Sequence, residues 1–355
     1  MLQAENLLEQ AHLLINQRLE LVQSRYTGVA QLRAHDYQLL DCLKLLSATS
    51  AVAANALPQW LQWLQAPVSA IALNTNDTAC FMQPQQALLL LSQIKWHQHF
   101  VPPFAPPGDR ALLQQQALSG SDIGWQLASY AGLTLNPFRT DTALTCAALW
   151  YLACSAQNNL LAELVAMRTA LATDDPLVVH CMLAEYVLGQ RTQEDALVSQ
   201  LSAQQELTAP ALMLLIAGAS DAVQAKIINQ LAGNHATLKH AIAAMGYSGQ
   251  LKFVPLLAEL AQQHELNNVA TDALSMLLGV IESDSLLADQ AAVAQFQLQP
   301  HSARQLAGAS INDLQLSAVW RTGNVQQRQL AACYRSLATP ATKLPATDML
   351  LGAGL

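Results

Sequence analysis

Apolar residues recur at helical spacing from the beginning of the chain. In the N-terminal segment they stand four positions apart, at Leu7, Ala11, Ile15 and Leu19. Because an α-helix repeats every 3.6 residues, this spacing places them on one face. The pattern predicts an amphipathic helix that runs to about Val22.

A second apolar stripe predicts a helix from Tyr37 to Leu46, directly after Asp36. An aspartate at this position can accept a hydrogen bond from a backbone N–H of the first turn, so Asp36 is the expected N-cap. Two amphipathic helices this close in the chain can bury their stripes against each other, and we expect an antiparallel pair. The second stripe consists of Leu39, Leu40, Leu43 and Leu46.

The helical pattern is then interrupted. Between residues 45 and 91 it is broken, with Pro58 and Pro84 where first-turn prolines would stand. Residues 95–110, KWHQHFVPPFAPPGDR, hold four prolines and a glycine, which predicts a loop or domain boundary at about 100–109. A second break, TLNPFRTD, spans residues 134–141.

The second half of the chain contains an internal repeat. Four apolar segments close in the same way, at Gly189, Gly218, Gly246 and Gly279, a spacing of about 30 residues. Glycine in a left-handed conformation ends a helix at little steric cost. Three of these closings are followed by another amphipathic segment: DALVSQLSA, DAVQAKIINQL and FVPLLAELAQQ. Stacked helix pairs of this length are typical of an α-solenoid.

Polar residues mark the expected helix starts. Asn234 and Asn267 precede their closing glycines at the same distance and are expected N-caps, and Asp175 stands before Pro176. The acidic doublets 174–175 and 194–195 also fall at helix starts, where carboxylates complement the helix dipole. Helix capping therefore explains these carboxylates without acid–base catalysis.

The segment FVPLLAELAQQHELNNVATDALSMLLG, residues 253–279, resembles a HEAT repeat: a first helix, a turn, and a second helix that ends in glycine. The HEAT unit carries an aspartate in the turn and an arginine early in the second helix. Here Asn267 and Asn268 occupy the turn, and Ala270 follows Val269 where the arginine would stand. The resemblance implies a HEAT-like fold from about residue 141.

The chain as a whole resembles a bacterial family of HEAT-like proteins that are often encoded beside type VI secretion clusters. The resemblance includes the N-terminal helical pair and the tail, where WRTG at residues 320–323 leads into QQRQLAACYRSL. It implies a role in secretion assembly or effector handling. In HEAT arrays the second helix of each pair lines the concave face, which makes Lys239, Thr271 and Asp272 candidate partner contacts.

Composition narrows the classes of partner. The chain has 17 basic and 25 acidic residues among 355, a net charge of −8, and only 12% charged residues against 52% apolar ones. A nucleic-acid groove needs clustered cations, which a chain with this composition cannot easily supply. Low charge and high hydrophobicity also argue against disorder. We therefore expect a protein partner and no nucleic acid.

The cysteines and the apolar stretches indicate a cytoplasmic location. Six cysteines lie far apart, and Cys146, Cys154 and Cys181 fall in apolar runs, which predicts reduced core residues. Glu5 and Glu9 stand where a signal peptide would carry basic residues, so no signal peptide is expected. The charge-free stretch 45–76 contains amides and two prolines, so no membrane insertion is expected.

Candidate chemistry is sparse. His97 and His99 lack partners at a metal-ligand spacing. The surrounding loop offers Trp96, Phe100 and Phe104 as an apolar contact surface, although these side chains could equally cover the end of the helical stack. His180 and Cys181 lie in an apolar run that is typical of a core, and His235 and His240 are too far apart on a helix to share one face.

No phosphate-binding, zinc-protease or nucleophile-elbow motif occurs, so no catalytic residue, metal site or cofactor is predicted. Two enzyme hypotheses remain beside the binding role. A helical-repeat DNA glycosylase could use Trp125, Trp150 and Asp141, but the acidic pI disfavours it. A HEAT-like lyase that acts on a bound pigment has only the fold in its favour.

These observations predict an all-α protein. We expect a helical N-terminal region (1–108), connecting helices and a loop (109–140), HEAT-like repeats (141–300) and a C-terminal cap or tail (301–355). The expected function is that of a protein-binding scaffold or adaptor, possessing no enzymatic activity, in type VI secretion.

Overall fold

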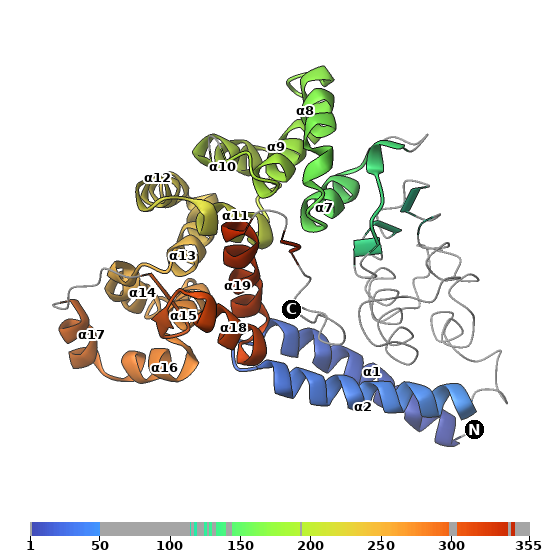
Figure 1. Cartoon of the computed structure of the whole chain (residues 1–355). Coiled ribbons are helices and arrows are strands. Elements are labelled where there is room, and N and C mark those ends of the chain that lie inside the picture. Colours follow the sequence, from blue (N-terminus) through green and yellow to red (C-terminus); the bar gives the residue numbers. More distant parts are fainter. Residues whose placement is uncertain are drawn as a thin grey trace. The chain divides into compact units, whose positions relative to one another are not determined.

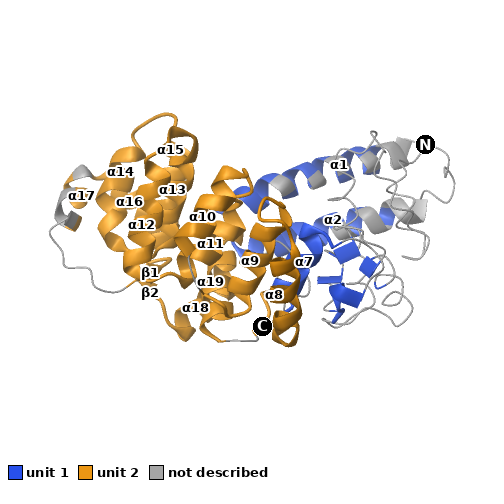
Figure 2. Cartoon of the chain, turned by 90° about the horizontal axis from the view of Figure 1, so that it is seen from above, with its two compact units in different colours: residues 1–155, 345–355 blue, residues 156–344 orange. Residues whose placement is uncertain are grey.

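The computed structural model describes residues 2–49, 114, 117–118, 124–125, 128–129, 133–139, 144–191, 194–297, 304–339 and 342–344. These residues are mostly helical (Figure 1), which confirms the all-α prediction. Strands occur in the described ranges as one short antiparallel pair, β1 (Gln305–Leu306) and β2 (Ala309–Ser310). The chain divides into two compact units, residues 1–155 with 345–355 and residues 156–344 (Figure 2).

The N-terminal unit begins with a helical hairpin. Helix α1 (Leu2–Gln23) and helix α2 (Val29–Thr49) pack side by side (Figure 1), as the two apolar stripes predicted. Helix α2 begins eight positions earlier than the predicted start at Tyr37. Its additional turns add apolar burial to the hairpin, because Val29 and Leu32 are buried there. Further buried side chains are Ala11, Leu14, Leu39 and Cys42.

Asp36 is not an N-cap, because it lies in the interior of α2. Its carboxylate accepts two hydrogen bonds from Arg18 of α1, from Nε at 2.7 Å and from Nη2 at 3.2 Å. Both residues are buried, and His35 Nδ1 lies 3.8 Å from the same carboxylate. Burial alone raises the pKa of Asp36, but His35 and Arg18 outweigh it and hold this pKa below its ordinary value.

This buried ion pair leads to a pH-dependent prediction. Because the pKa of Asp36 is lowered on folding, its contribution is present above the unfolded pKa and is lost as pH falls through the folded value. We expect Asp36→Asn to destabilise the hairpin by about 2 kcal/mol at pH 7, since the buried Arg18 would lose the carboxylate that accepts two of its hydrogen bonds. Hydrogen exchange of the α1 and α2 amides measures this effect. The difference between variant and native chain should shrink in acid, and a difference independent of pH would contradict the assignment.

The rest of the described N-terminal unit centres on helix α7 (Cys146–Cys154). Thr145 caps this helix by accepting a hydrogen bond from the amide of Ala148. The hydroxyl of Tyr151 donates to the carbonyl of Leu133 at 2.6 Å and accepts from the amide of Leu135 at 2.8 Å. These bonds hold an irregular segment that leads into the 3-10 helix η3 (Pro137–Arg139), within the break predicted at 134–141.

The second unit is a succession of short helices. The three amphipathic segments predicted to be helical after the glycines are helices α10, α12 and α14. The elements of the unit in chain order are η4 (Asn158–Leu160), α8 (Leu161–Ala170), α9 (Leu177–Val187), α10 (Glu194–Ala203), α11 (Ala209–Gly218), α12 (Asp221–Ala232), η5 (His235–Thr237), α13 (Leu238–Tyr247), η6 (Leu251–Phe253), α14 (Val254–Leu260), α15 (Asn267–Leu278), α16 (Val280–Ala288), α17 (Gln290–Gln297), β1, β2, α18 (Asp313–Thr322) and α19 (Val325–Ala338).

Helices α11, α13 and α15 form the interior of this unit. Each contacts the next, and α12 and α14 pack against α13 and α15 from outside (Figures 1 and 2). Every residue of α11 from Ala211 to Ala217 is buried. A helix that is apolar all round must be covered on all sides, so α11 needs neighbours on more than one face.

The closing glycines have two different roles. Gly189 and Gly279 adopt positive φ values of 115° and 86°, as predicted for residues that end a helix. Gly218 and Gly246 do not, because both still belong to their helices: Gly218 is the last residue of α11 and Gly246 the last but one of α13. A Cβ at Gly246 would lie 2.7 Å from the Cα of Ala273, so glycine is needed there for the close approach of α13 and α15. The prediction of one common role was wrong for these two positions.

The predicted caps are partly correct. Asn234 caps η5 by accepting a hydrogen bond from the amide of Ala236, and Asp175 accepts one from the amide of Leu177. Asn267 is not an N-cap: it is the first residue of α15, and its amide donates to the carbonyl of Ala261. The side chain thus ties α15 back to the end of α14. Glu194 and Asp195 lie in the first turn of α10, as predicted.

Candidate functional site

Helix α19 lies along the interior row of the second unit. It packs against α11 and against α18 (Figure 1). Near its beginning, Gln327 Nε2 donates to the carbonyl of Ser275 in α15 at 3.0 Å. Further along, the hydroxyl of Tyr334 donates to the carbonyl of Tyr247 at the end of α13, at 2.9 Å. One C-terminal helix therefore contacts three interior helices in succession.

The start of α19 is fixed by its own sequence. Asn324 and Gln327 form a capping box, in which each side chain accepts from the other residue's backbone amide. The guanidinium group of Arg328 lies over the ring of Trp320 at 4.5 Å, and its Nε donates to the carbonyl of Trp320 at 3.0 Å. These contacts set the turn between α18 and α19. They lie in the WRTG…QQRQL segment that belongs to the family resemblance.

The β1–β2 hairpin covers the carbonyl end of α15. The amides of Ala307 and Gly308 donate to the carbonyls of Met276 and Leu277, at 2.8 and 2.9 Å. Both residues have positive φ values, 50° and 84°, which is the conformation of a type I′ turn. The amide of Gln305 donates to the carbonyl of Gly249 at 2.7 Å, which joins the hairpin to the segment after α13. The hairpin thereby brings Arg304 and Ser310 beside the interior helices.

A cavity of about 370 Å³, widely open to solvent, lies where α11, the β hairpin and the end of α19 meet. Two arginines reach it, from different parts of the chain. Arg191 donates through Nη2 to the carbonyl of Leu337, in the last turn of α19. Arg304 donates through Nη2 to the carbonyl of Ala219 at 2.9 Å and forms an ion pair with Asp221. The lining residues are Arg191, Ala217, Gly218, Arg304, Ser310, Ile311, Tyr334, Leu337 and Ala338.

Tyr334 forms part of the cavity wall and is itself buried. Burial raises the pKa of its hydroxyl to about 12, although Arg304 acts in the opposite direction. Tyr334 is therefore neutral at physiological pH and serves as a hydrogen-bond donor to Tyr247. It is not a candidate base or nucleophile.

The partner contacts predicted from the sequence have different environments. Lys239 is exposed at the start of α13. Thr271 is buried on α15, and its hydroxyl donates to the carbonyl of Asn267. Asp272 is half-buried beside it. Their role as partner contacts stays a prediction. The predicted contact surface of Trp96, Phe100 and Phe104 lies outside the described residues, and so do the histidines at 97 and 99.

The two tryptophans considered for a catalytic role and the pair His180 and Cys181 are buried or half-buried. Trp125 is buried, with its ring 5.0 Å from that of Tyr151, and Trp150 is half-buried; Asp141 lies outside the described ranges. Cys181 is buried, as predicted, and His180 beside it is half-buried. Burial lowers the pKa of His180, and Glu206, 3.9 Å away, acts in the opposite direction.

The prediction of core cysteines is right for two of the three. Cys154 and Cys181 are buried, and burial raises the pKa of the Cys154 thiol to about 12. Cys146 is exposed, because the first residue of α7 stands before the buried part of that helix. A thiol at a helix start can point outward even when the run of residues around it is apolar. The apolar run alone could not show this.

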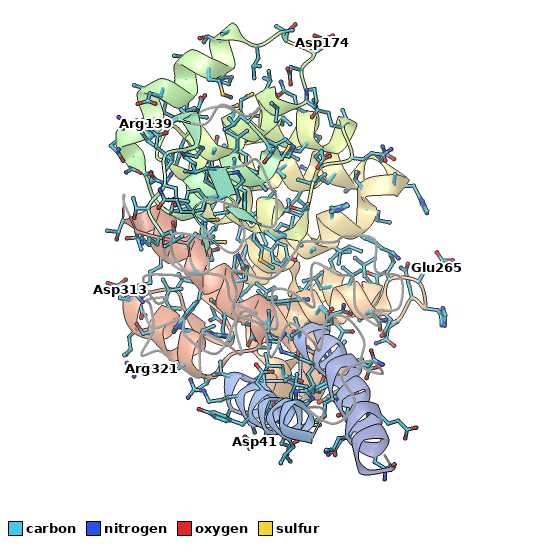
Figure 3. All side chains as sticks on the ribbon, turned by 90° about the vertical axis from the view of Figure 1, so that its right-hand side faces the viewer. Asp41, Arg139, Asp174, Glu265, Asp313 and Arg321 are labelled. Carbon is cyan, nitrogen blue, oxygen red and sulfur yellow. The ribbon has the colours of Figure 1, made fainter. Side chains whose placement is uncertain are left out.

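Charged side chains are dispersed over the described surface. Those labelled in Figure 3 lie at the periphery and are all exposed. They come from different parts of the chain, except that Asp313 and Arg321 both belong to α18. Among the described residues, no group of three or more histidine, cysteine, aspartate or glutamate side chains could hold a metal ion. Within the same ranges, no helix is long and apolar enough to cross a membrane. The labelled residues are Asp41, Arg139, Asp174, Glu265, Asp313 and Arg321.

Comparisons with known proteins give no relative from which a function could be transferred: no family model, curated protein or solved structure matches this chain. The function is therefore inferred from the residues and contacts of this structure and from the resemblance found in its sequence.

Proposed function

We propose that residues 156–344 are a HEAT-like α-solenoid and that the protein is a scaffold or adaptor that holds another protein. One observation carries this proposal: the interior helices α11, α13 and α15 contact one another in sequence order, with α12 and α14 outside them. Stacked helix pairs of this kind offer extended surfaces for binding protein segments. The resemblance to HEAT-like proteins encoded beside type VI secretion clusters suggests secretion assembly or effector handling as the setting.

Buried amides support the view of a stiff scaffold. Gln224 of α12 is completely buried, and its Nε2 donates to the carbonyl of Ile216 in α11 at 2.7 Å. Gln250, after α13, donates in turn to Oε1 of Gln224. Satisfied buried polar groups fix one arrangement of the helices, because any shift would leave an amide without its partner. A stiff array can bind a partner with little loss of its own conformational freedom.

The face along the interior helices is not open in this chain, since α19 lies on it. A solenoid with an empty concave face could accept a helix there. In this protein the equivalent place is filled by the chain's own C-terminal helix, in which Leu330, Cys333 and Leu337 are buried. The partner is therefore expected to bind at the edges of α19, where Arg191 and Ala338 are exposed, or on the outer helices.

Affinity capture tests the binding role. The tagged full-length chain is expressed in the bacterium that encodes it and purified at moderate salt, and retained proteins are identified by mass spectrometry. We expect one protein, a secretion component or effector, to be retained in a fixed ratio and to bind the purified chain again when both are mixed. A chain that retains no protein but carries nucleic acid or a coloured small molecule would overturn the proposal in favour of an enzyme.

A further inference from the structure

The two-arginine cavity of the second unit has unused hydrogen-bonding capacity. A guanidinium group carries five N–H donors. The bond from Arg191 to Leu337 uses Nη2, and among the described residues its Nε and Nη1 donate to no acceptor. The Ser310 side chain, also in the cavity wall and exposed, makes no hydrogen bond within those residues. The cavity thus has donors that are available to a ligand.

The charge of the cavity selects an acceptor. Arg304 is paired with Asp221, whereas Arg191 has no carboxylate within ion-pair distance in the described part of the chain. Arginine presents its donors in a planar fork that matches the two oxygens of a carboxylate or phosphate. An anionic group on the ligand would therefore be held by Arg191, with Ser310 in reach of the same cavity.

The helix ends around the cavity favour a carboxylate over a phosphate. The last residues of α11 and of α19 both line it, as Ala217, Gly218, Leu337 and Ala338. The carbonyl end of a helix carries a partial negative charge. A dianionic phosphate would be repelled by two such ends, whereas a singly charged carboxylate is repelled less.

The apolar wall and the size define the rest of the ligand. Ala217, Ile311 and Leu337 provide apolar surface next to the guanidinium groups. A volume of about 370 Å³ lies at the small end of the range for ligand pockets. It suits a carboxylate side chain together with the neighbouring apolar side chain of a peptide.

We propose that this cavity binds an acidic segment of the partner protein, with the carboxylate of one Asp or Glu on Arg191 and a neighbouring apolar side chain against α11 and α19. The inference rests on the proposed scaffold function and specifies where and by what chemistry the partner is held. It also gives a role to the C-terminal helix, whose last turn forms one wall of the cavity.

The test uses two peptides that differ only in charge, acetyl-Leu-Glu-Leu-amide and the same peptide with glutamine. Each is titrated into the full-length chain while the Nε–H signal of Arg191 is followed by NMR. We expect the glutamate peptide to shift this signal in a saturable way and the glutamine peptide to bind about tenfold more weakly, the difference made by a charge-assisted hydrogen bond. No saturable shift with the glutamate peptide, or equal binding of both peptides, would overturn the inference.

Two variants of the chain separate binding from folding. Arg191→Gln removes the charge but also the bond to Leu337, so its effect could come from a change in folding. The second variant, Ala338→Phe in the native chain, fills the cavity from an exposed position and leaves both arginines in place. Each variant should weaken the binding of the glutamate peptide by about tenfold or more. Arg321→Gln, at an exposed arginine of α18, is the matched control and should leave binding unchanged (Figure 3).

Inorganic phosphate forms the third arm of the experiment. Phosphate that binds more tightly than the glutamate peptide would contradict the choice of a carboxylate; weaker binding supports it. The capture experiment separates this inference from the function. A partner that the native chain and the Ala338→Phe variant retain equally would leave the scaffold role standing and reject the cavity as its site.

Discussion

Removal of the chain from residue 301 onward is expected to make the remaining protein aggregate. The deleted part contains α19, which covers α11, and every residue of α11 from Ala211 to Ala217 is buried in the intact chain. Without α19 an apolar helix face would be exposed, and contiguous apolar patches drive association. The loss also leaves carbonyl groups of α13 and α15 without their donors Tyr334 and Gln327. Size-exclusion chromatography with light scattering measures the outcome.

A pair of point variants provides the control for this deletion. Leu330 of α19 is 1% exposed and Leu314 of α18 is 82% exposed. Leu330→Asp buries a charge without a partner and should cost more than about 4 kcal/mol of the free energy of unfolding. Leu314→Asp makes the same chemical change in solvent and should stay within about 0.5 kcal/mol. A soluble truncation of unchanged stability, or equal effects of the two variants, would show that α19 is not part of the core.

The change Gly246→Ala is expected to destabilise the second unit by about 3 kcal/mol, as overpacking of a well-packed core does. The added Cβ would lie 2.7 Å from the Cα and 2.9 Å from the carbonyl oxygen of Ala273. Both are atoms of the backbone or attached to it, so no side chain can rotate away, and α13 and α15 would have to separate. Urea unfolding followed by circular dichroism measures the change.

Gly233→Ala is the matched control, because it makes the same substitution in the same unit. Gly233 has a φ of −70°, and a Cβ there would lie 3.5 Å from its nearest neighbour. Replacement of glycine at a compatible position restricts the unfolded chain and should stabilise the protein by about 0.5 kcal/mol. Equal effects of the two substitutions would mean that the contact between α13 and α15 is looser than described.

Local sequence patterns predicted the helices of this protein well. The apolar stripes around Ala11 and Leu39 gave the N-terminal hairpin, and the amphipathic segments after the glycines became α10, α12 and α14. Asn234 caps a helix as its residue type suggests. These features depend on residues a few positions apart, which a periodic pattern records directly.

Features that depend on distant residues could not be predicted in this way. Asp36 was expected as a cap because it stands directly before an apolar stripe, but it lies inside α2, where Arg18 of the neighbouring helix donates two hydrogen bonds to its carboxylate. Gly246 was expected to end a helix, but Ala273 on another helix requires its small size. In each case the decisive partner is far away in the chain, and the residue type alone fits either role.

The candidate cavity could not be predicted either, because residues that are distant in the chain form it. Arg191 and Arg304 are separated by more than a hundred positions, and only the path of α19 and the β hairpin brings them to one place. The available signal was indirect. WRTG followed by QQRQL was part of the family resemblance, and in the structure Gln327 of this segment bonds α19 to the interior helix α15, while Arg328 bonds it to α18.

The most direct test of the scaffold proposal is hydrogen exchange of the purified chain, alone and with its captured partner. We expect the partner to add protection in the second unit, around Arg191, Ser310 and Ala338, and to add none to these segments in the Ala338→Phe variant. Two results would contradict the scaffold proposal. Either the partner protects only residues 2–49, or it leaves hydrogen exchange unchanged throughout residues 156–344.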